Sequence, residues 1–188
     1  GMGIHVLTST PLPGTDGPVA GALAAVALGF RIAAAEQRQE GRVSMPYAFT
    51  TQEIEYIRHG GTGYMAKMYL PSGDGPFPMV IDLHGGAWTQ GDLADCDARD
   101  QVLAASGIVV AAINFRHGAD RYPSSCADIN FAIRWMKANA AKFRGNPAQI
   151  GLSGTSSGGH LAMLVAMRPN DPRYAAIASP PGADVDAS

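Results

Sequence analysis

Three short runs of apolar residues dominate the middle of the chain, at positions 79–83, 108–113 and 150–153. Each run is nearly continuous rather than alternating, which is typical of strands that are covered on both faces of a sheet. Between them, residues 95–105 and 125–143 carry apolar positions at helical spacing. Strands that alternate with helices in this way predict a parallel sheet with right-handed crossovers and helices on its faces.

The sequence also indicates where these helices begin and end. Gly107 is expected to end the first helix, and Gly145 with Pro147 is expected to end the second. Ser125-x-x-Asp128 has the form of a capping box, which predicts the start of the second helix.

An antiparallel strand pair is predicted ahead of this unit. Residues 53–58 alternate polar and apolar positions, as a half-buried strand does, and residues 64–70 form the return strand after the turn Gly60-Gly61. The expected fold class is therefore α/β, with a mostly parallel sheet flanked by helices and an antiparallel N-terminal strand pair.

The chain divides into two parts in this interpretation. Residues 1–45 form an N-terminal arm that is irregular over residues 3–17 and continues into an amphipathic helix over residues 18–40. Residues 46–188 hold the α/β core. After Arg168 the tail is rich in Pro, Ala, Gly and Asp and shows no strand pattern.

The composition is that of a folded globular protein, with 46% hydrophobic and 16% charged residues. A net charge of −2 without a basic cluster argues against a nucleic-acid partner. The apolar segment at residues 19–30 is too short to span a membrane, so no membrane partner is expected. Cys96 and Cys126 lack the spacing of a metal site and are expected to be reduced, which favours a cytoplasmic location.

The third apolar run leads directly into Gly154-Thr155-Ser156-Ser157-Gly158, which has the form G-x-S-x-G. Between a strand and a helix, this pattern predicts a nucleophile elbow with Ser156 exposed at the apex of a tight turn. Ser157 would open the following helix with a free backbone N–H. That helix, residues 161–167, is apolar on nearly all sides, so we expect it to be deeply buried.

A second motif, His84-Gly85-Gly86-Ala87-Trp88, follows the first apolar run. Loops of this kind supply the backbone donors that stabilise an oxyanion during acyl transfer. We expect His84 to brace this loop by hydrogen bonding.

The two motifs together resemble those of the α/β-hydrolase superfamily. The similarity is greatest to its esterase branch, which includes hormone-sensitive-lipase-like carboxylesterases and kynurenine-formamidase-like enzymes. The resemblance implies that Ser156 is the nucleophile of a serine hydrolase acting on a carboxylic ester or a small amide or formamide. It also implies an oxyanion hole formed by the N–H groups of Ser157, Gly86 and Ala87, with Gly85 shaping the turn.

The resemblance covers residues 50–175 and then the family pattern breaks. In the family, the triad acid and histidine follow the serine in the chain. His160 is the only histidine after Ser156, and it lies one helical turn along, where its ring cannot readily turn back to the hydroxyl. His117, at the end of the middle strand, is the only base candidate in the chain worth testing.

The acidic residues do not complete a site in this interpretation. Asp184 and Asp186 come before the strand that should precede the family's acid, and solvated loop carboxylates are the simpler explanation. A cluster of aspartates near the first helix lacks convergent ligand spacing. We expect neither a metal nor a cofactor.

Two kinds of function remain open. The chain could be the nucleophile-bearing part of a serine esterase whose acid and histidine lie on a companion polypeptide or a missing segment. It could instead be a non-catalytic binding or interaction remnant of the fold, or a truncated inactive fragment.

The sheet edge carries a further expectation. In the resembling fold, the strand after the nucleophile strand pairs along its free side. Without that strand, residues 149–153 would present unpaired backbone groups, and a bare edge promotes association. We therefore expect a companion chain or a homo-oligomer rather than a stable monomer.

Overall fold

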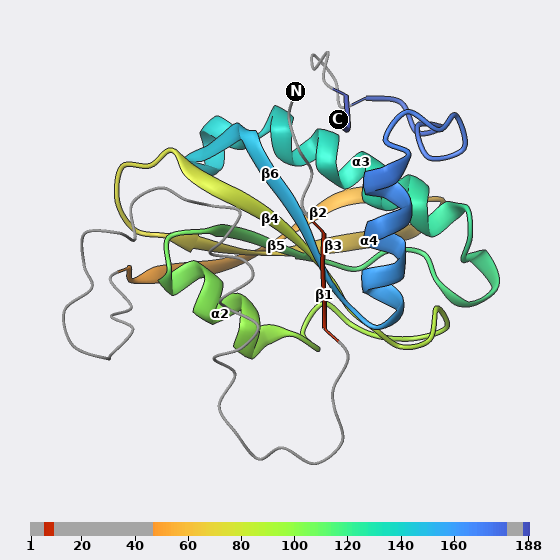
Figure 1. Ribbon diagram of the computed structural model, residues 1–188, viewed down its shortest axis with the longest axis horizontal. Coiled ribbons are helices and arrows are strands. Elements are labelled where there is room, and N and C mark those ends of the chain that lie inside the picture. The colour runs from red at the N-terminus through yellow and green to blue at the C-terminus, as the bar shows by residue number, and fades with distance from the viewer. Residues whose placement is uncertain (1–5, 10–46, 180–185) are drawn as a thin grey trace.

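The computed structural model describes residues 6–9, 47–179 and 186–188 of the chain. These residues form one mixed sheet of six strands in the order β1-β6-β4-β5-β3-β2 (Figure 1). The neighbours β1–β6, β6–β4 and β4–β5 run parallel, and β5–β3 and β3–β2 run antiparallel. The strands are β1 (Val6–Ser9), β2 (Phe49–His59), β3 (Thr62–Pro71), β4 (Phe77–Leu83), β5 (Val109–Ile113) and β6 (Gly145–Thr155).

Helices cover both faces of the sheet. Helix α2 (Asp97–Ala105) lies on one face, while α3 (Ser124–Ala138) and α4 (Ser157–Met167) lie on the other (Figure 1). Two short 3-10 helices, η2 (Gly118–Asp120) and η3 (Ala140–Phe143), lie before and after α3 in the chain.

Side chains of the central strands alternate between two apolar cores. In β4, Met79, Ile81 and Leu83 belong to the core that includes α3 and α4, whereas Val80 belongs to the core that includes α2. The strand β5 alternates in the same way. Because both faces are covered, the apolar runs are continuous, and the predicted α/β class is confirmed.

The predicted antiparallel pair is also confirmed, with longer strands than the pattern indicated. His59 pairs with Thr62 across the turn at Gly60-Gly61. β3 then pairs with β5, which joins the hairpin to the parallel part of the sheet.

β1 corrects two predictions. Within the arm that we predicted to be irregular, Val6–Ser9 form a strand that pairs in parallel with residues 152–155 of β6. The edge of β6 that we predicted to be bare is therefore covered at Leu152 and Ser153. The backbone partners there come from β1, near the N-terminal end of the sequence. The rest of the arm and the helix predicted over residues 18–40 lie outside the described residues.

The predicted capping box of the second helix is wrong. α3 begins at Ser124, and no side chain caps its N-terminus. Asp128 instead accepts from the backbone N–H of Arg116 at 2.9 Å and from its guanidinium at 2.7 Å, and it lies 2.7 Å from Nε2 of His59. A fully buried carboxylate must be paired with hydrogen-bond donors, so Asp128 binds Arg116 and His59 instead of capping the helix.

The helix end and the following strand also differ from the prediction. α3 stops at Ala138, η3 follows, and Arg144 adopts a left-handed conformation with φ of 56°. β6 then starts at Gly145, so Gly145 and Pro147 belong to a strand longer than the predicted residues 150–153.

The tail after α4 packs back onto α3. Asn130 donates to the carbonyl of Pro169 at 2.8 Å, and Arg134 donates to the carbonyl of Ile177 at 2.8 Å. Tyr174 is buried in the same core. No strand occurs in the described part of this tail, in agreement with its sequence.

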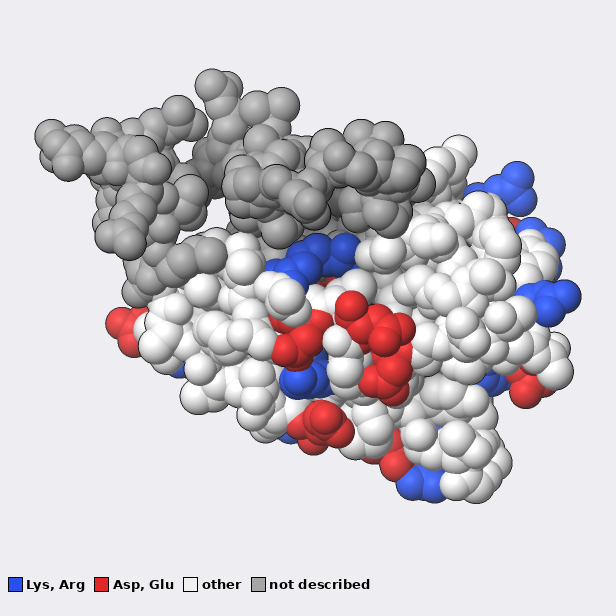
Figure 2. All heavy atoms as spheres, turned by 90° about the horizontal axis from the view of Figure 1, so that it is seen from below, with Lys and Arg blue, Asp and Glu red and all other residues white. Residues whose placement is uncertain are grey.

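Charged side chains of both signs are mixed on the face of the molecule shown in Figure 2. On the α2 side of the sheet, Asp97 accepts hydrogen bonds from Lys67, Tyr69 and Gln101. These donors, Lys67 foremost, hold the pKa of Asp97 at about 2. Among the described residues, no helix is both long enough and apolar enough to cross a membrane.

Asp100 of α2 is the least well satisfied buried group in this region. Its side chain is fully buried, and neither carboxyl oxygen has a hydrogen-bond partner within the described residues. Burial raises the pKa of Asp100 well above its usual range, and the neighbouring charge of Asp82 raises it further. Arg99 and Asp97 are the other charged groups that act on it, with opposite effects.

This raised pKa makes a prediction about stability. An unfolded aspartate titrates near pH ~3.9, so the contribution of Asp100 to stability is greatest below that pH and falls as the pH rises toward its raised folded pKa. Asp100→Asn should remove this contribution, which amounts to at most about 1.4 kcal/mol per pH unit for one group, so the variant should gain more stability over wild type at pH 8 than at pH 5. Urea unfolding of both proteins at pH 5 and pH 8 measures it.

The matched control is Asp74→Asn, on an exposed loop. It should leave the pH dependence of stability unchanged. Equal slopes for wild type and Asp100→Asn would show that Asp100 is ionised in the folded protein.

Candidate active site

The two sequence motifs lie together because β4 and β6 are parallel neighbours. Leu83 of β4 is in register with Gly154 of β6, so the loops that follow both strands leave the same edge of the sheet. A Cβ placed on Gly85 would lie only 3.6 Å from the Cβ of Ser156. The glycine loop, residues 84–90, therefore lies against the serine turn, residues 154–158.

Ser156 occupies the turn between β6 and α4 and is exposed. Its backbone has φ of 52° and ψ of −115°, a conformation that costs a residue with a side chain about 1–3 kcal/mol. Ser157, the first residue of α4, is buried, and its backbone N–H lies at the helix N-terminus, where no intrahelical acceptor exists.

Two glycines make this turn possible. A Cβ on Gly158 would come within 2.4 Å of the carbonyl oxygens of Leu83 and His84, and a Cβ on Gly154 would come within 2.5 Å of the backbone of Gly158. Such distances are far below van der Waals contact. Only glycine at both positions lets the first turn of α4 lie against the ends of β4 and β6.

The glycine loop has three successive residues with positive φ: Gly86 at 105°, Ala87 at 52° and Trp88 at 63°. The carbonyl of Gly86 accepts from the N–H groups of Thr89 and Gln90, at 3.1 and 3.2 Å, which closes the loop. A Cβ on Gly86 would lie 2.1 Å from the carbonyl oxygen of Gln90. This position therefore requires glycine for both its space and its backbone angle.

His84 lies buried at the base of this loop. Its Nδ1 is 2.8 Å from the carbonyl oxygen of Gly85, which can only accept, so Nδ1 carries the proton. The ring stacks on Phe115 with centroids 4.4 Å apart. Burial lowers the pKa of His84, so the ring is neutral at pH 7.

His160 is exposed, which corrects the prediction of a deeply buried helix. Met163 and Met167 of α4 are exposed as well, while Leu161, Ala162 and Val165 pack into the core. The helix is apolar on nearly all sides in sequence, but only one side is covered by the described residues.

The ring of His160 faces the glycine loop. The indole N–H of Trp88 donates to Nδ1 of His160 at 3.3 Å, and the two rings meet edge to face. This contact joins the glycine loop to α4 on the outer side of the site.

The other described histidines lie in different surroundings. The ring of His117 is 5.8 Å from that of His84, and the N–H of Gly118 donates to the carbonyl of Trp88 at 2.8 Å. His117 thus lies beside the glycine loop. Within residues 47–179, only His59 pairs with a carboxylate, that of Asp128.

Sequence reasoning missed a polar cluster directly behind the serine turn. Arg99 of α2 donates to both carboxyl oxygens of Asp82, at 2.6 and 2.7 Å, and to Oγ1 of Thr155 at 2.8 Å. Asp82 is 2% exposed. The available signal was an aspartate inside an otherwise apolar strand, because a buried charge requires a partner.

The described residues contain no group of three or more His, Cys, Asp or Glu side chains placed to hold a metal ion. Asp186, which we considered as a triad acid, is exposed and lies 3.7 Å from Nζ of Lys137. Asp184 lies outside the described residues.

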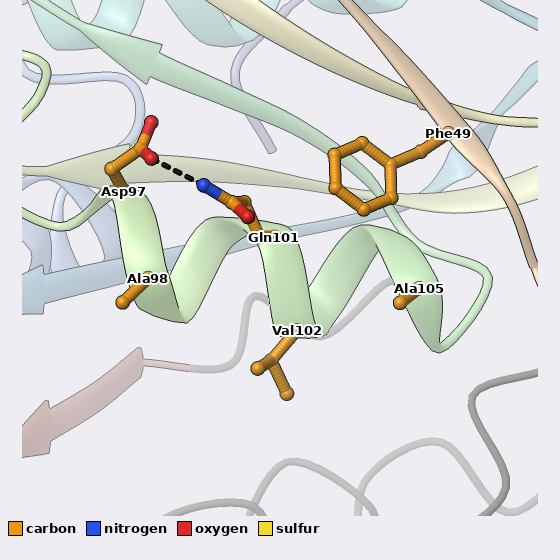
Figure 3. Close-up of a pocket in the computed structure, with 6 residues that line it drawn as sticks. All are labelled: Phe49, Asp97, Ala98, Gln101, Val102 and Ala105. Carbon is orange, nitrogen blue, oxygen red and sulfur yellow. Dashed lines mark hydrogen bonds between the residues drawn. The ribbon is translucent and has the colours of Figure 1, made fainter.

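A shallow hollow of about 530 Å³ lies away from the serine turn, along α2 and beside Phe49 of β2 (Figure 3). None of its lining residues belongs to either motif, so it has no place in the chemistry of Ser156. The lining residues are Phe49, Asp97, Ala98, Gln101, Val102 and Ala105.

Comparison with known proteins gives both curated relatives and solved structures. LipM of Mycobacterium tuberculosis, a probable carboxylic ester hydrolase, is 34% identical over 65% of this chain and 29% of its own length. Esterase LipC of the same organism is 40% identical over 54% of this chain and 26% of its own. The chain thus spans less than a third of either relative.

The gibberellin receptor GID1 of Oryza sativa is also similar, with 35% identity over 51% of this chain and 29% of its own length. Among solved structures, esterase 2 of Thermogutta terrifontis phosphorylated by paraoxon matches with a TM-score of 0.56 and 27% identity. That match covers 60% of this chain and 45% of the esterase.

The BD-FAE family model matches residues 66–180, which include both glycine motifs, β4 to β6 and α4. This match covers more than half of the chain, and the strand order and the solved esterases agree with it. The chain therefore belongs to the BD-FAE family and is an α/β-hydrolase of the esterase branch.

Proposed function

We propose that this chain carries the nucleophile and the oxyanion hole of a serine hydrolase that acts on carboxylic esters or small amides. The observation that supports this most is the exposed Ser156, held in a strained turn and packed against the glycine loop. Strained backbone conformations persist only where the surrounding structure holds them in place, and they are concentrated at functional sites.

The proposed reaction is acyl transfer through Ser156. Its Oγ attacks the acyl carbon and its proton passes to a histidine, while the N–H groups of Ser157, Gly86 and Ala87 stabilise the developing oxyanion. The bond to the alcohol or amine then breaks as that leaving group takes the proton. Water, activated by the same histidine, hydrolyses the acyl-enzyme.

We propose that the histidine and the acid come from a companion chain or from a segment outside these 188 residues. Two observations support this. Within residues 47–179, only His59 pairs with a carboxylate, and the chain matches less than half the length of the similar esterase. A homo-oligomer is the other assembly that the partly covered β6 edge favours.

A binding protein is the second candidate, and the similarity to the receptor GID1 favours it. In such a protein the serine turn would be retained as structure, and Ser156 would have no nucleophilic role. Covalent labelling of Ser156 distinguishes the two candidates.

The first prediction concerns the nucleophile. A fluorophosphonate probe should label the chain, purified with any polypeptide that accompanies it, at Ser156. Ser156→Ala should abolish labelling and ester turnover with little change in melting temperature, because the side chain is exposed. Mass spectrometry of the labelled peptide measures the first effect, and thermal unfolding measures the second.

The matched control is Ser72→Ala, at an exposed position in the loop after β3, which should label as wild type. Full ester turnover by Ser156→Ala would contradict the nucleophile assignment. An unlabelled Ser156 in the presence of its partners would favour the binding protein.

The second prediction concerns the oxyanion hole. Gly86→Ala places a Cβ 2.1 Å from the carbonyl oxygen of Gln90, which must open the loop and displace its N–H donors. We expect the labelling rate to fall by roughly 100-fold or more, the effect of losing one such donor. The melting temperature should fall modestly because alanine is strained at this positive φ, but the protein should still fold because residues 87–90 are exposed and lie outside the core.

Gly61→Ala is the control, since a Cβ at Gly61 meets nothing within 4 Å. The loop would have only a structural role if Gly86→Ala strongly lowered stability while the molecules that remain folded were labelled at the wild-type rate.

The third prediction concerns the base. Because His117 has no carboxylate partner among the described residues, His117→Ala should leave the labelling rate of Ser156 within about twofold of wild type. The pH profile of labelling provides the measurement. Loss in His117→Ala of the rise in labelling rate from acid to neutral pH would make His117 the base and remove the need for a companion histidine.

A further inference from the structure

The serine turn is bound from behind by a side chain of α2. Nη1 of Arg99 donates to Oγ1 of Thr155 at 2.8 Å, and Thr155 directly precedes Ser156. Cys96 of the loop before α2 approaches the same hydroxyl at 3.6 Å through its Sγ. The hydroxyl of Thr155 is thus the attachment point between α2 and the turn.

Arg99 is itself held in a fixed orientation. Its Nη2 donates to both oxygens of Asp82, at 2.6 and 2.7 Å, and the Asp82 side chain is 1% exposed. The planar guanidinium fixes the direction of its remaining donors once this carboxylate is bound. Asp82 lies in β4 in register with Ser153 of β6, next to the strand end that it supports.

The backbone of Thr155 also lies close to the other half of the site, at Gly85. A Cβ on Gly85 would lie 3.2 Å from the carbonyl oxygen of Thr155. A change in the backbone angles of Thr155 would therefore alter the backbone of Ser156. It would also move the carbonyl oxygen of Thr155 relative to Gly85 in the glycine loop. The strained φ of 52° at Ser156 persists only if neighbouring contacts prevent such rotation.

We propose that Asp82, Arg99 and Thr155 form a positioning relay for the nucleophile, in which Arg99 holds the Thr155 hydroxyl and so fixes the strained turn at Ser156. This proposal rests on the proposed hydrolase function for its catalytic consequence. None of the three residues touches the reacting atoms, and all act through the backbone of Ser156. The competing explanation is that Arg99 only neutralises the buried Asp82.

Thr155→Val separates these explanations because it removes the hydroxyl and leaves the Arg99–Asp82 ion pair in place. We expect the second-order rate constant for labelling of Ser156 by a fluorophosphonate to fall about tenfold. In ester turnover, kcat should fall and KM should stay unchanged. The N–H of His160 donates to the carbonyl of Ser156 at 3.1 Å, and its amide hydrogen exchange should become at least tenfold faster. Thr155→Ser keeps the hydroxyl and should restore both values to within about twofold of wild type.

Arg99→Lys tests the cation. A lysine keeps a positive charge beside Asp82, but its single ammonium cannot reproduce the fork that binds the carboxylate and Thr155 together. Arg99→Lys should therefore show the same slower labelling of Ser156 and the same faster amide hydrogen exchange as Thr155→Val. Thr51→Val, on the exposed part of β2, is the matched control and should match wild type in both.

Hydrogen exchange decides the proposal independently of activity. If wild type is not labelled but the His160 amide of Thr155→Val still exchanges faster, the hydrolase function fails and the relay stands. If Thr155→Val and Arg99→Lys exchange at the wild-type rate, the relay is overturned, whatever the labelling rate does.

Discussion

The arrangement of the site depends on one close contact, that between the first turn of α4 and the ends of β4 and β6. Gly158 lies so near the carbonyl oxygens of Leu83 and His84 that no side chain fits between them. β4 and β6 are parallel neighbours, so this contact fixes the distance between the two loops that follow them. The serine turn and the glycine loop therefore form one rigid unit rather than two independent loops.

That unit contains unusual backbone strain. Ser156 and two residues of the glycine loop, Ala87 and Trp88, have positive φ although none of them is glycine. Each such residue costs energy that its surroundings must offset. The contacts come from two directions: the Trp88–His160 hydrogen bond joins the loop to α4 in front, and Arg99 holds Thr155 from behind.

Much of this could be predicted from sequence because the relevant signals are local. Continuous apolar runs identified the central strands, and the glycines at 154 and 158 indicated a tight strand-to-helix turn. The pairing of β1 with β6 could not be predicted, since a short strand from a distant segment carries no signal of its partner. The interpretation of Ser125 and Asp128 as a cap failed because the tertiary partners of Asp128, Arg116 and His59, are distant in sequence.

The charge distribution behind the serine turn follows from the same geometry. In the proposed reaction, an ionised carboxylate close to Ser156 would oppose the negative charge that develops on the carbonyl oxygen of the substrate. Asp82 is neutralised by two bonds from Arg99, and burial together with the charge of Asp82 raises the pKa of Asp100, which favours its neutral form. The electrostatics in front of Ser156 are therefore left to the helix N-terminus and the backbone N–H groups, which favour an anion there.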